Sequence, residues 1–425
     1  MWRMSTQTPA KPSPRLIQRV YLTLTLLNTL AASFIWGINT LFLLDAGLTN
    51  TQAFLANAFF TVGQVIFEVP TGIVADMKGR RTSYLLGTLT LALSTFAYLG
   101  AWMIQGPFWM WVVASIMLGL GFTFFSGATE AWLVDSLNYA DFKGNLDAVF
   151  GRAQSVSGVA MLTGSVAGGL VAQASNLGVP YWLRIGLLLA TLVVAAIYMR
   201  DWGFTPERGA SISADMRQLF KTSIDLGLRK PRVRWVMLAA PFASGVGIYV
   251  FYAMQPHLLN LYGDQAAYGV AGLAAAIVAG AQIVGGILGP ALRQRVARRT
   301  SALLIGAVLS AAMLLLISQI ATFWLAIVVL SIWGLIFAAV MPIRQAYLNG
   351  LIPSKQRATV LSFDALMGSS GGAVFQPVLG RAADAGGYPF SFMVGGLIQA
   401  VAIPLIGLAH RENLRHASDE NQEAG

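Results

Sequence analysis

Long apolar stretches without charged residues alternate with short polar segments along almost the whole chain. Residues 20–44 contain no Asp, Glu, Lys or Arg, and neither do residues 82–129 or 300–343. A helix of about 20 apolar residues crosses the hydrocarbon core of a bilayer. The two longer stretches have room for two crossings each, with turns near residues 105–107 and 319–323. The pattern predicts an all-α integral membrane protein.

The same pattern, applied to the whole chain, predicts twelve transmembrane helices. The first six are expected at residues 16–44, 51–75, 82–104, 107–137, 149–174 and 178–200. The second six are expected at residues 231–261, 265–292, 300–320, 322–350, 357–384 and 387–409.

These helices divide the chain into two bundles of six. We expect one bundle over residues 16–200 and the other over residues 231–410, joined by a cytoplasmic linker over residues 201–230. An amphipathic segment is expected near residues 213–228 of the linker. Residues 1–15 and 411–425 are polar and are expected to be cytoplasmic tails, the first of them disordered.

Basic residues mark one side of the predicted bundle. All but three of the 28 Lys and Arg residues lie in the tails, the linker or the inner loops, and the six outer connections contain none. The exceptions are Arg184, Arg344 and Arg381. By the positive-inside rule both termini are cytoplasmic (N-in and C-in). The net charge of +10 is therefore expected to face the lipids of the inner (cytoplasmic) membrane, not nucleic acid.

The residues that carry enzyme chemistry are scarce. The chain has no Cys, which excludes thiolate metal sites, thiol catalysis and disulfides. None of the three histidines, His257, His410 and His416, begins a His-x-x-x-x-Asp pattern of the acyltransferase type. We therefore expect no enzyme, no metal and no cofactor. A receptor or scaffold that transports nothing is also disfavoured, because several carboxylates lie within the predicted spans.

The two bundles share an internal repeat. Arg-Arg-Thr-Ser at residues 80–83 recurs at residues 298–301, and Glu-Ala-Trp-Leu at 130–133 matches Gln-Ala-Tyr-Leu at 345–348. Six helices in each half give both copies the same orientation. Such repeats are related by an axis along the membrane normal and predict alternating access around a cavity near the midplane.

One loop carries a family resemblance. Residues 72–81 read Gly-Ile-Val-Ala-Asp-Met-Lys-Gly-Arg-Arg. They resemble the cytoplasmic-loop signature of the major facilitator superfamily, Gly-x-Leu-Ala-Asp-Arg-x-Gly-Arg-Lys, with departures at Val74 and Met77. Residues 67–71 and 126–132 resemble the bacterial drug-exporter branch of that superfamily. The resemblance implies the twelve-helix fold, a monomer, and drug:proton antiport driven by the proton gradient.

The signature loop is expected to act as a gate. Asp76 ends a helix whose last carbonyls are already partially negative, so it is better placed to face the start of another helix, near Arg357. The gating residues are taken to be Gly72, Asp76, Gly79, Arg80, Arg81 and Asp135. The glycines permit close approach and a tight turn. The simpler alternative is that the basic residues only anchor the topology.

Small residues in the helix expected at 149–174 admit two interpretations. Gly164, Ser165, Gly168 and Gly169 resemble the Gly-Pro-x-x-Gly-Gly element of proton-driven drug antiporters, with Ser165 in place of proline. Alternatively they serve ordinary close packing of helices. The arginine that such antiporters usually carry midway along the fourth helix is absent near residues 115–119. Proton coupling would then depend on other groups.

Four ionisable residues are candidates for proton coupling. Glu68, Glu130, Arg344 and Asp364 each lie roughly 10 Å, or about seven residues, from the inner end of their expected helices. Charges inside a membrane are costly and are functional candidates by default. Crowding of three carboxyl groups should make at least one of them a proton acceptor, and Glu130 is expected to pair with Arg344 when the inner side closes. In the alternative, Arg344 and Asp364 form a structural pair and Glu68 caps a kink near Pro70.

The substrate cavity is expected between the first, fourth, seventh and tenth helices, as the resemblance implies. Its candidate residues are Asn28, Trp36, Asn39, Tyr249, Tyr252, Gln255, Trp333 and Met341. Aromatic side chains with scattered hydrogen-bonding groups favour a lipophilic or amphiphilic small molecule. The sequence thus predicts a proton-coupled exporter, and a proton-coupled importer of a nutrient or lipid-like solute remains the alternative.

Overall fold

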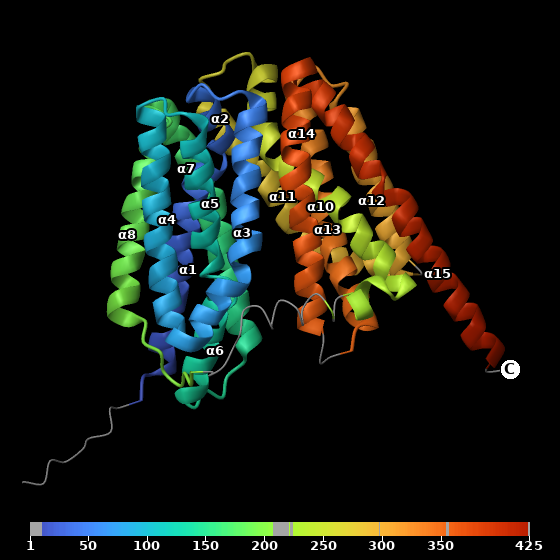
Figure 1. Ribbon diagram of the computed structural model, residues 1–425, viewed down its shortest axis with the longest axis horizontal. Helices are drawn as coiled ribbons and strands as arrows, with labels where there is room; N and C mark the ends of the chain where they lie inside the picture. The colour runs from blue at the N-terminus through green and yellow to red at the C-terminus, as the bar shows by residue number, and fades with distance from the viewer. Residues whose placement is uncertain (1–10, 207–220, 222–223, 297, 354–356, 424–425) are drawn as a thin grey trace, which may run out of the picture.

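The computed structural model describes residues 11–206, 221, 224–296, 298–353 and 357–423, and every regular element in these residues is a helix (Figure 1). The first half contains α1 (Pro14–Trp36), α2 (Asn39–Asp45), α3 (Asn50–Lys78), α4 (Arg80–Met103), α5 (Phe108–Thr123), α6 (Ala128–Tyr139), α7 (Leu146–Ala174) and α8 (Val179–Tyr198). The second half contains η1 (Ile224–Leu228), α10 (Pro231–Tyr262), α11 (Tyr268–Gln294), α12 (Arg299–Ile317), α13 (Phe323–Leu351), α14 (Arg357–Ala400) and α15 (Ala402–Glu423).

The described helices make twelve crossings. Ten continuous spans are long and apolar enough to cross a membrane, and the pair α1 and α2, bent by 47°, makes an eleventh. One of the ten covers 57 residues, or about 85 Å, nearly three times the thickness of the hydrocarbon core. Its backbone leaves the helical conformation at Gly386 and Gly387. That span is therefore two crossings, which confirms the predicted all-α membrane fold.

Local sequence signals explain where several helices begin and end. Thr49 and Gln52 form a capping box at the start of α3, which satisfies backbone N–H groups that the helix leaves free. Ser13 caps α1, where Pro14 occupies the first turn, a position that suits proline because its N–H is not needed. The left-handed Gly263 ends α10.

Three features of the helices differ from the sequence prediction. The fourth crossing is divided into α5 and α6 by residues 124–127, where Gly127 has a φ of +67°. The first crossing bends at Gly37, which packs closely against Gly272 of α11. The last helix continues to Glu423, beyond the expected end at 409, because the polar sequence there still favours a helix. Most of the expected amphipathic segment, 213–228, lies outside the described residues.

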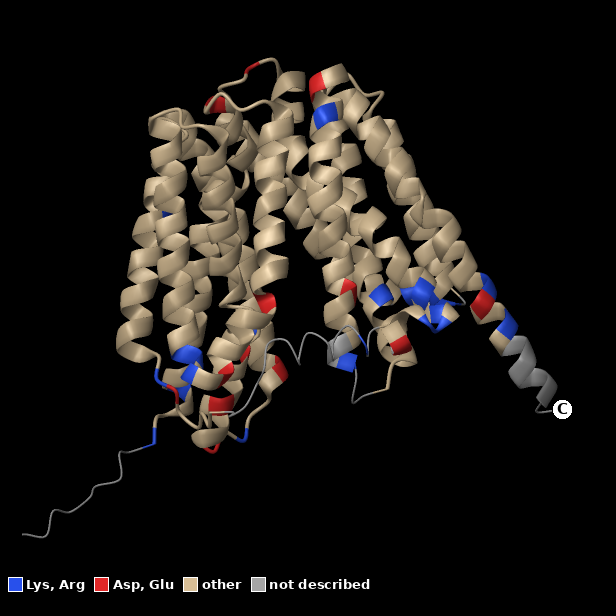
Figure 2. Ribbon diagram, in the orientation of Figure 1, with Lys and Arg blue, Asp and Glu red and all other residues tan. Residues whose placement is uncertain are grey.

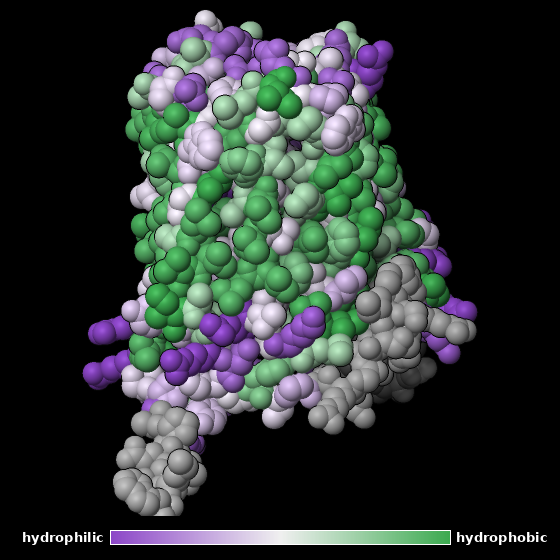
Figure 3. Space-filling view, turned by 60° about the vertical axis from the view of Figure 1, so that its left-hand side comes forward, coloured by the Kyte–Doolittle hydropathy of each residue, from purple (hydrophilic) through white to green (hydrophobic). Residues whose placement is uncertain are grey.

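The two halves lie side by side and diverge toward the end where α1 begins and α15 ends (Figure 1). Lys and Arg gather at this end, which we call the basic end (Figure 2). A broad apolar band separates it from the polar opposite end (Figure 3). Large apolar side chains such as Trp324 and Ile287 are 75% and 72% exposed, as expected for helix surfaces that face the membrane. The positive-inside rule assigns the basic end to the cytoplasm.

The halves contact each other mainly through two helix pairs, α3 with α14 and α7 with α11. The hydrogen bonds that join them involve the ends of these helices away from the basic end, such as those of Asp384 with Asn50 and of Gln173 with Gly269. Among the described residues, no hydrogen bond joins the halves near the basic end. The structure is thus closed on the outer side and open toward the basic end.

The glycines of α7 bring three helices into close contact. A Cβ on Gly164 would lie 2.0 Å from Ser33 Oγ, and one on Gly168 would lie 1.8 Å from the backbone oxygen of Phe34, both on α1. A Cβ on Gly169 would meet the backbone of α11 at 2.5 Å. The packing interpretation of this segment therefore has direct structural support, while a role in antiport stays a prediction.

Replacing Gly168 with alanine is expected to destabilise the fold by about 1–3 kcal/mol, because the new methyl group would overlap a backbone atom that cannot move freely. Thermal unfolding of the purified protein in detergent measures the loss. Gly186→Ala on α8 is the matched control, since a Cβ there meets no atom within 4 Å. Equal unfolding midpoints for the two variants would contradict the close packing of α1 and α7.

Candidate functional site

A central cavity of about 590 Å³ lies between the two halves. Residues from nearly every transmembrane helix line it, including those of α3, α4, α8 and α11 in addition to the four crossings expected from the sequence. Its aromatic lining residues are Trp36, Phe60, Tyr98, Phe122, Phe251, Tyr252, Trp333 and Phe337, and its uncharged polar residues include Asn28, Asn39, Asn57, Gln64 and Gln282. Apolar surface predominates.

Five of the eight residues predicted to line a substrate cavity do line this one. They are Asn28, Trp36, Asn39, Tyr252 and Trp333. An amide network fixes one of them: Asn39 Nδ2 donates to Asn57 Oδ1 at 3.0 Å, and the Tyr181 hydroxyl donates to Asn39 Oδ1 at 3.2 Å.

The other three predicted residues lie elsewhere, which corrects the prediction. Tyr249 is buried and its hydroxyl bonds with that of Ser391. Gln255 joins the two halves, because its Oε1 accepts from the Thr40 backbone N–H at 3.0 Å. Met341 lies in a separate small cavity beside Arg344. The residues of α10 that line the cavity are Gly247, Ile248, Phe251 and Tyr252, whereas the side chains of Tyr249 and Gln255 contact other parts of the protein.

Arg184 on α8 is a cavity residue that the sequence analysis did not select. It is 2% exposed, yet it lines the central cavity. Its Nε donates to Thr95 Oγ1 at 3.0 Å, and its Nη1 donates to the Ala31 backbone oxygen at 3.3 Å. A charged residue in the apolar segment 179–198 was the available signal, but the sequence alone did not indicate which way the side chain points.

Glu130 lines a side pocket of about 260 Å³ and belongs to α6, which lies toward the basic end (Figure 1). Asn28 and Thr29 line both this pocket and the central cavity, so the two spaces adjoin. Glu130 occupies the first turn of α6, just after the left-handed Gly127. Its carboxylate forms no ion pair with any residue that the structure describes.

The other intramembrane candidates do not form one cluster. Arg344 binds Asp364 through two hydrogen bonds of 2.5 Å, and Asp364 is buried. The structural pair considered as the alternative is therefore present, and Arg344 does not pair with Glu130 in this conformation. Glu68 is exposed and accepts a hydrogen bond of 2.6 Å from Ser126 Oγ, which links α3 to the break before α6.

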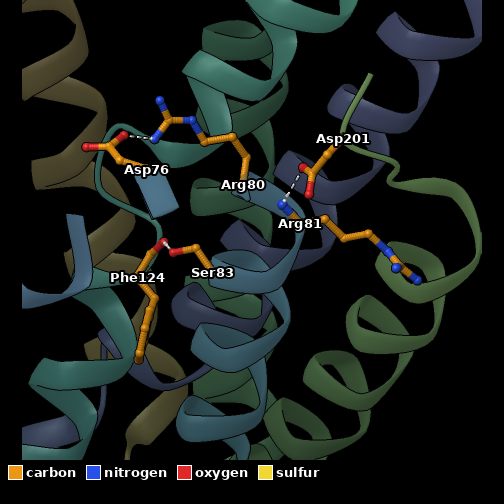
Figure 4. Close-up of polar contacts among 6 residues, drawn as sticks. All are labelled: Asp76, Arg80, Arg81, Ser83, Phe124 and Asp201. Carbon is orange, nitrogen blue, oxygen red and sulfur yellow. Dashed lines mark hydrogen bonds and ion pairs between the residues drawn. The ribbon is translucent and has the colours of Figure 1, made fainter. Parts of the chain in front are cut away.

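The signature loop is held by partners within the first half (Figure 4). Asp76 pairs with Arg80, four residues later. The Arg81 backbone N–H donates to Asp201 Oδ1 at 2.8 Å, so Asp201 caps the start of α4. Gly79 has a φ of +101°, and a Cβ there would lie 2.2 Å from Asp201 Oδ2. The backbone conformation thus favours glycine at this position, and any side chain there would displace the Asp201 carboxylate.

Three more residues, Asp201, Asp135 and Gly72, lie in or near this loop, and two of them were predicted to take part in the gate. Burial raises the pKa of the Asp201 carboxyl, and the hydrogen bond from the Arg81 backbone opposes that rise. Asp135 was expected to be a partner of the loop, but its carboxylate forms no hydrogen bond or ion pair within the described part of the chain. Asp201 occupies that role because the chain after α8 returns to the first turn of α4. A Cβ on Gly72, the remaining predicted gate residue, would meet no atom within 4 Å.

A second acidic residue closes the outer end. Asp384 on α14 accepts hydrogen bonds from the backbone N–H groups of Asn50 and Thr51 at 3.0 and 2.9 Å, and from both of their side chains. It thereby caps α3 across the boundary between the halves, where the helix dipole favours a negative charge. We call this contact the outer lock. Residues 380–384 read Gly-Arg-Ala-Ala-Asp, which matches the Gly-x-x-Ala-Asp of residues 72–76.

Comparison with known proteins agrees with this architecture. The family profile described as Major Facilitator Superfamily matches residues 21–375 and 242–424. The chain belongs to the major facilitator superfamily. It is a transporter of that superfamily and not an enzyme. No curated protein sequence matches it.

Solved structures of other superfamily members share its fold. A mutant of the nucleoside transporter NupG has a TM-score of 0.76 at 12% identity, over 92% of this chain and 99% of that chain. A bacterial homologue of the human lysosomal transporter Spinster, inward-facing and unoccupied, has a TM-score of 0.71 at 14% identity, over 96% and 98%. A POT family transporter bound to a thioalcohol-conjugated peptide has a TM-score of 0.67 at 14% identity, over 93% and 96%. At these identities the likeness concerns the fold alone.

Replacing Asp384 with asparagine is expected to weaken the outer lock. Charge-assisted hydrogen bonds contribute about 1.5–3 kcal/mol, so the outward-open population should rise roughly tenfold or more. A Thr61→Cys substitution in this naturally Cys-free chain reports the change, because Thr61 lines the central cavity. Its labelling by a membrane-impermeant maleimide from outside the cell should accelerate in the Asp384→Asn background. Asp264→Asn, in an outer loop, is the control; equal labelling rates in both backgrounds would refute the lock.

Proposed function

We propose that this superfamily member is a proton-coupled exporter of lipophilic or amphiphilic small molecules, working by alternating access. The observation that carries the proposal is the adjacency of two spaces. The large aromatic cavity suits an apolar body, and the side pocket next to it holds the unpaired carboxylate of Glu130.

Glu130 is the proposed proton carrier. A carboxylate inside a membrane protein is costly to keep charged when water is withdrawn. In the conformation open to the basic end, Glu130 is exposed and can release its proton to the cytoplasm. In the opposite conformation it would take up a proton from the outer side before the cavity reopens inward. Glu68, Asp364 and Arg344 remain secondary candidates, the last two as a pair that stabilises one conformation.

Two acidic locks would alternate in this cycle. The outer lock of Asp384 is formed in the present conformation, while Asp76 pairs with its neighbour Arg80. When the basic ends of the two halves approach each other, Asp76 is proposed to turn to the start of α14, as Asp384 now caps α3. Each acid would then stabilise one of the two conformations.

Import by proton symport is the alternative function. It is favoured by the resemblance of the fold to a nucleoside transporter and to a POT family transporter that binds a peptide conjugate. The direction of proton movement separates the two functions. When substrate is added on one side of a vesicle and moves across the membrane, protons move in the direction opposite to the substrate in a proton antiporter. In a proton symporter they move in the same direction as the substrate.

The variant Glu130→Gln is expected to keep the fold and to lose substrate-coupled proton movement, because glutamine cannot exchange a proton. A pH-sensitive dye enclosed in proteoliposomes measures the coupling after addition of amphiphilic substrates. Glu412→Gln in the last helix makes the same chemical change away from both cavities and should retain wild-type coupling. Full coupling in the Glu130 variant would remove Glu130 from the mechanism.

A further inference from the structure

The described residues that line the central cavity include a single charged side chain. Among its lining residues there is no Asp, Glu, Lys or His, and Arg184 is the one arginine. Glu130 lines only the side pocket, and Arg344 and Asp364 neutralise each other away from the cavity. A ligand in the central cavity therefore meets a positive charge that no lining carboxylate compensates.

The hydrogen bonds of Arg184 leave part of its guanidinium free. Nε and Nη1 donate to the neutral acceptors Thr95 Oγ1 and Ala31 O. Nη2 donates to no acceptor among the described residues, and none of the ion pairs found there includes Arg184. Burial of an ion costs several kcal/mol even after relaxation, and neutral acceptors offset only part of that cost. An anion would offset it far better.

Tyr252 offers a second donor from the opposite half. It lies on α10 and lines the same cavity as Arg184. Its hydroxyl has no hydrogen-bond partner in the described part of the chain, and the hydroxyl oxygen is not among the inaccessible polar atoms. It is therefore available to a ligand in the cavity. An anion between Arg184 and Tyr252 would contact both halves of the transporter.

We propose that Arg184 is the binding site for a single anionic group of the substrate, and that the substrate is an amphiphilic monocarboxylate. This inference rests on the proposed function, in which the central cavity carries the substrate. One guanidinium without a second cation matches one carboxylate better than a phosphate dianion. The aromatic walls, with Trp36 and Trp333 among them, accommodate the apolar body.

The test compares probes that differ only in charge. Naphthoate, naphthylmethanol and naphthylmethylammonium, and the corresponding decyl compounds, are titrated against the protein in nanodiscs, with empty nanodiscs as the reference. Tryptophan fluorescence and calorimetry report binding. In each series the carboxylate should bind about tenfold or more tightly than the ammonium. Equal or tighter binding of the ammonium compounds, or no binding of either carboxylate at millimolar concentration, would overturn the proposal.

Variants separate anion binding from a structural role of Arg184. Arg184→Gln can still donate to neighbouring acceptors but has no charge, so it should lose the preference for carboxylate while its affinity for the alcohol stays unchanged. Arg184→Lys should retain part of the preference. Arg152→Gln, an exposed residue near the basic end, is the control. An equal loss of affinity for alcohol and carboxylate in Arg184→Gln would mean that the arginine only supports the fold.

Tyr252→Phe keeps the test decisive if Arg184→Gln does not fold. It removes one hydroxyl that bonds to no described residue, and it should weaken carboxylate binding several-fold without affecting the alcohol. Unchanged carboxylate affinity would contradict its part in the site. Since these are equilibrium measurements, they stand apart from proton coupling. Selective carboxylate binding without coupled proton movement would refute the proposed exporter and leave the anion site in place.

Discussion

The cost of placing charge in hydrocarbon governs where every ionisable group of this transporter lies. Most basic residues lie at one end, from which the positive-inside rule infers the orientation of the bundles. The charged side chains within the membrane region are stabilised in different ways. Arg344 and Asp364 bind each other, Glu68 and Glu130 stay exposed on the side that is open, and Arg184 borrows neutral oxygen atoms. The functional candidates are the charged groups that have no oppositely charged partner among the described residues.

The same short sequence pattern occurs at both ends of the molecule. Gly-x-x-Ala-Asp ends α3 at the inner side and recurs in α14 at the outer side. Each acid lies near the end of a helical stretch, and the two helices, α3 and α14, contact each other across the boundary between the halves. At the outer side it caps α3 with four hydrogen bonds, which gives the family signature at the inner side a structural counterpart. The proposed alternation between these two acids would give the transporter two discrete conformations.

The sequence predicted the helices well because an apolar stretch must cross the membrane as a helix. It also predicted five of the cavity residues and the pairing of Arg344 with Asp364 as one of two alternatives. It could not predict which face a side chain occupies, so Tyr249 and Gln255 were misplaced and Arg184 was overlooked. Asp201 was missed because its contact with Arg81 joins segments 120 residues apart. The break before α6 had only Gly127 as a local signal.

That break gives the short helix α6 an N-terminus of its own inside the protein, with Glu130 in its first turn. A negative charge there stabilises a helix by about 0.3–1 kcal/mol through its dipole. Any event that neutralises the carboxylate withdraws this support, so the charge of a single side chain is tied to fraying of the backbone beside it. In the proposed cycle, protonation of Glu130 would thus loosen the first turn of α6, next to its junction with α5.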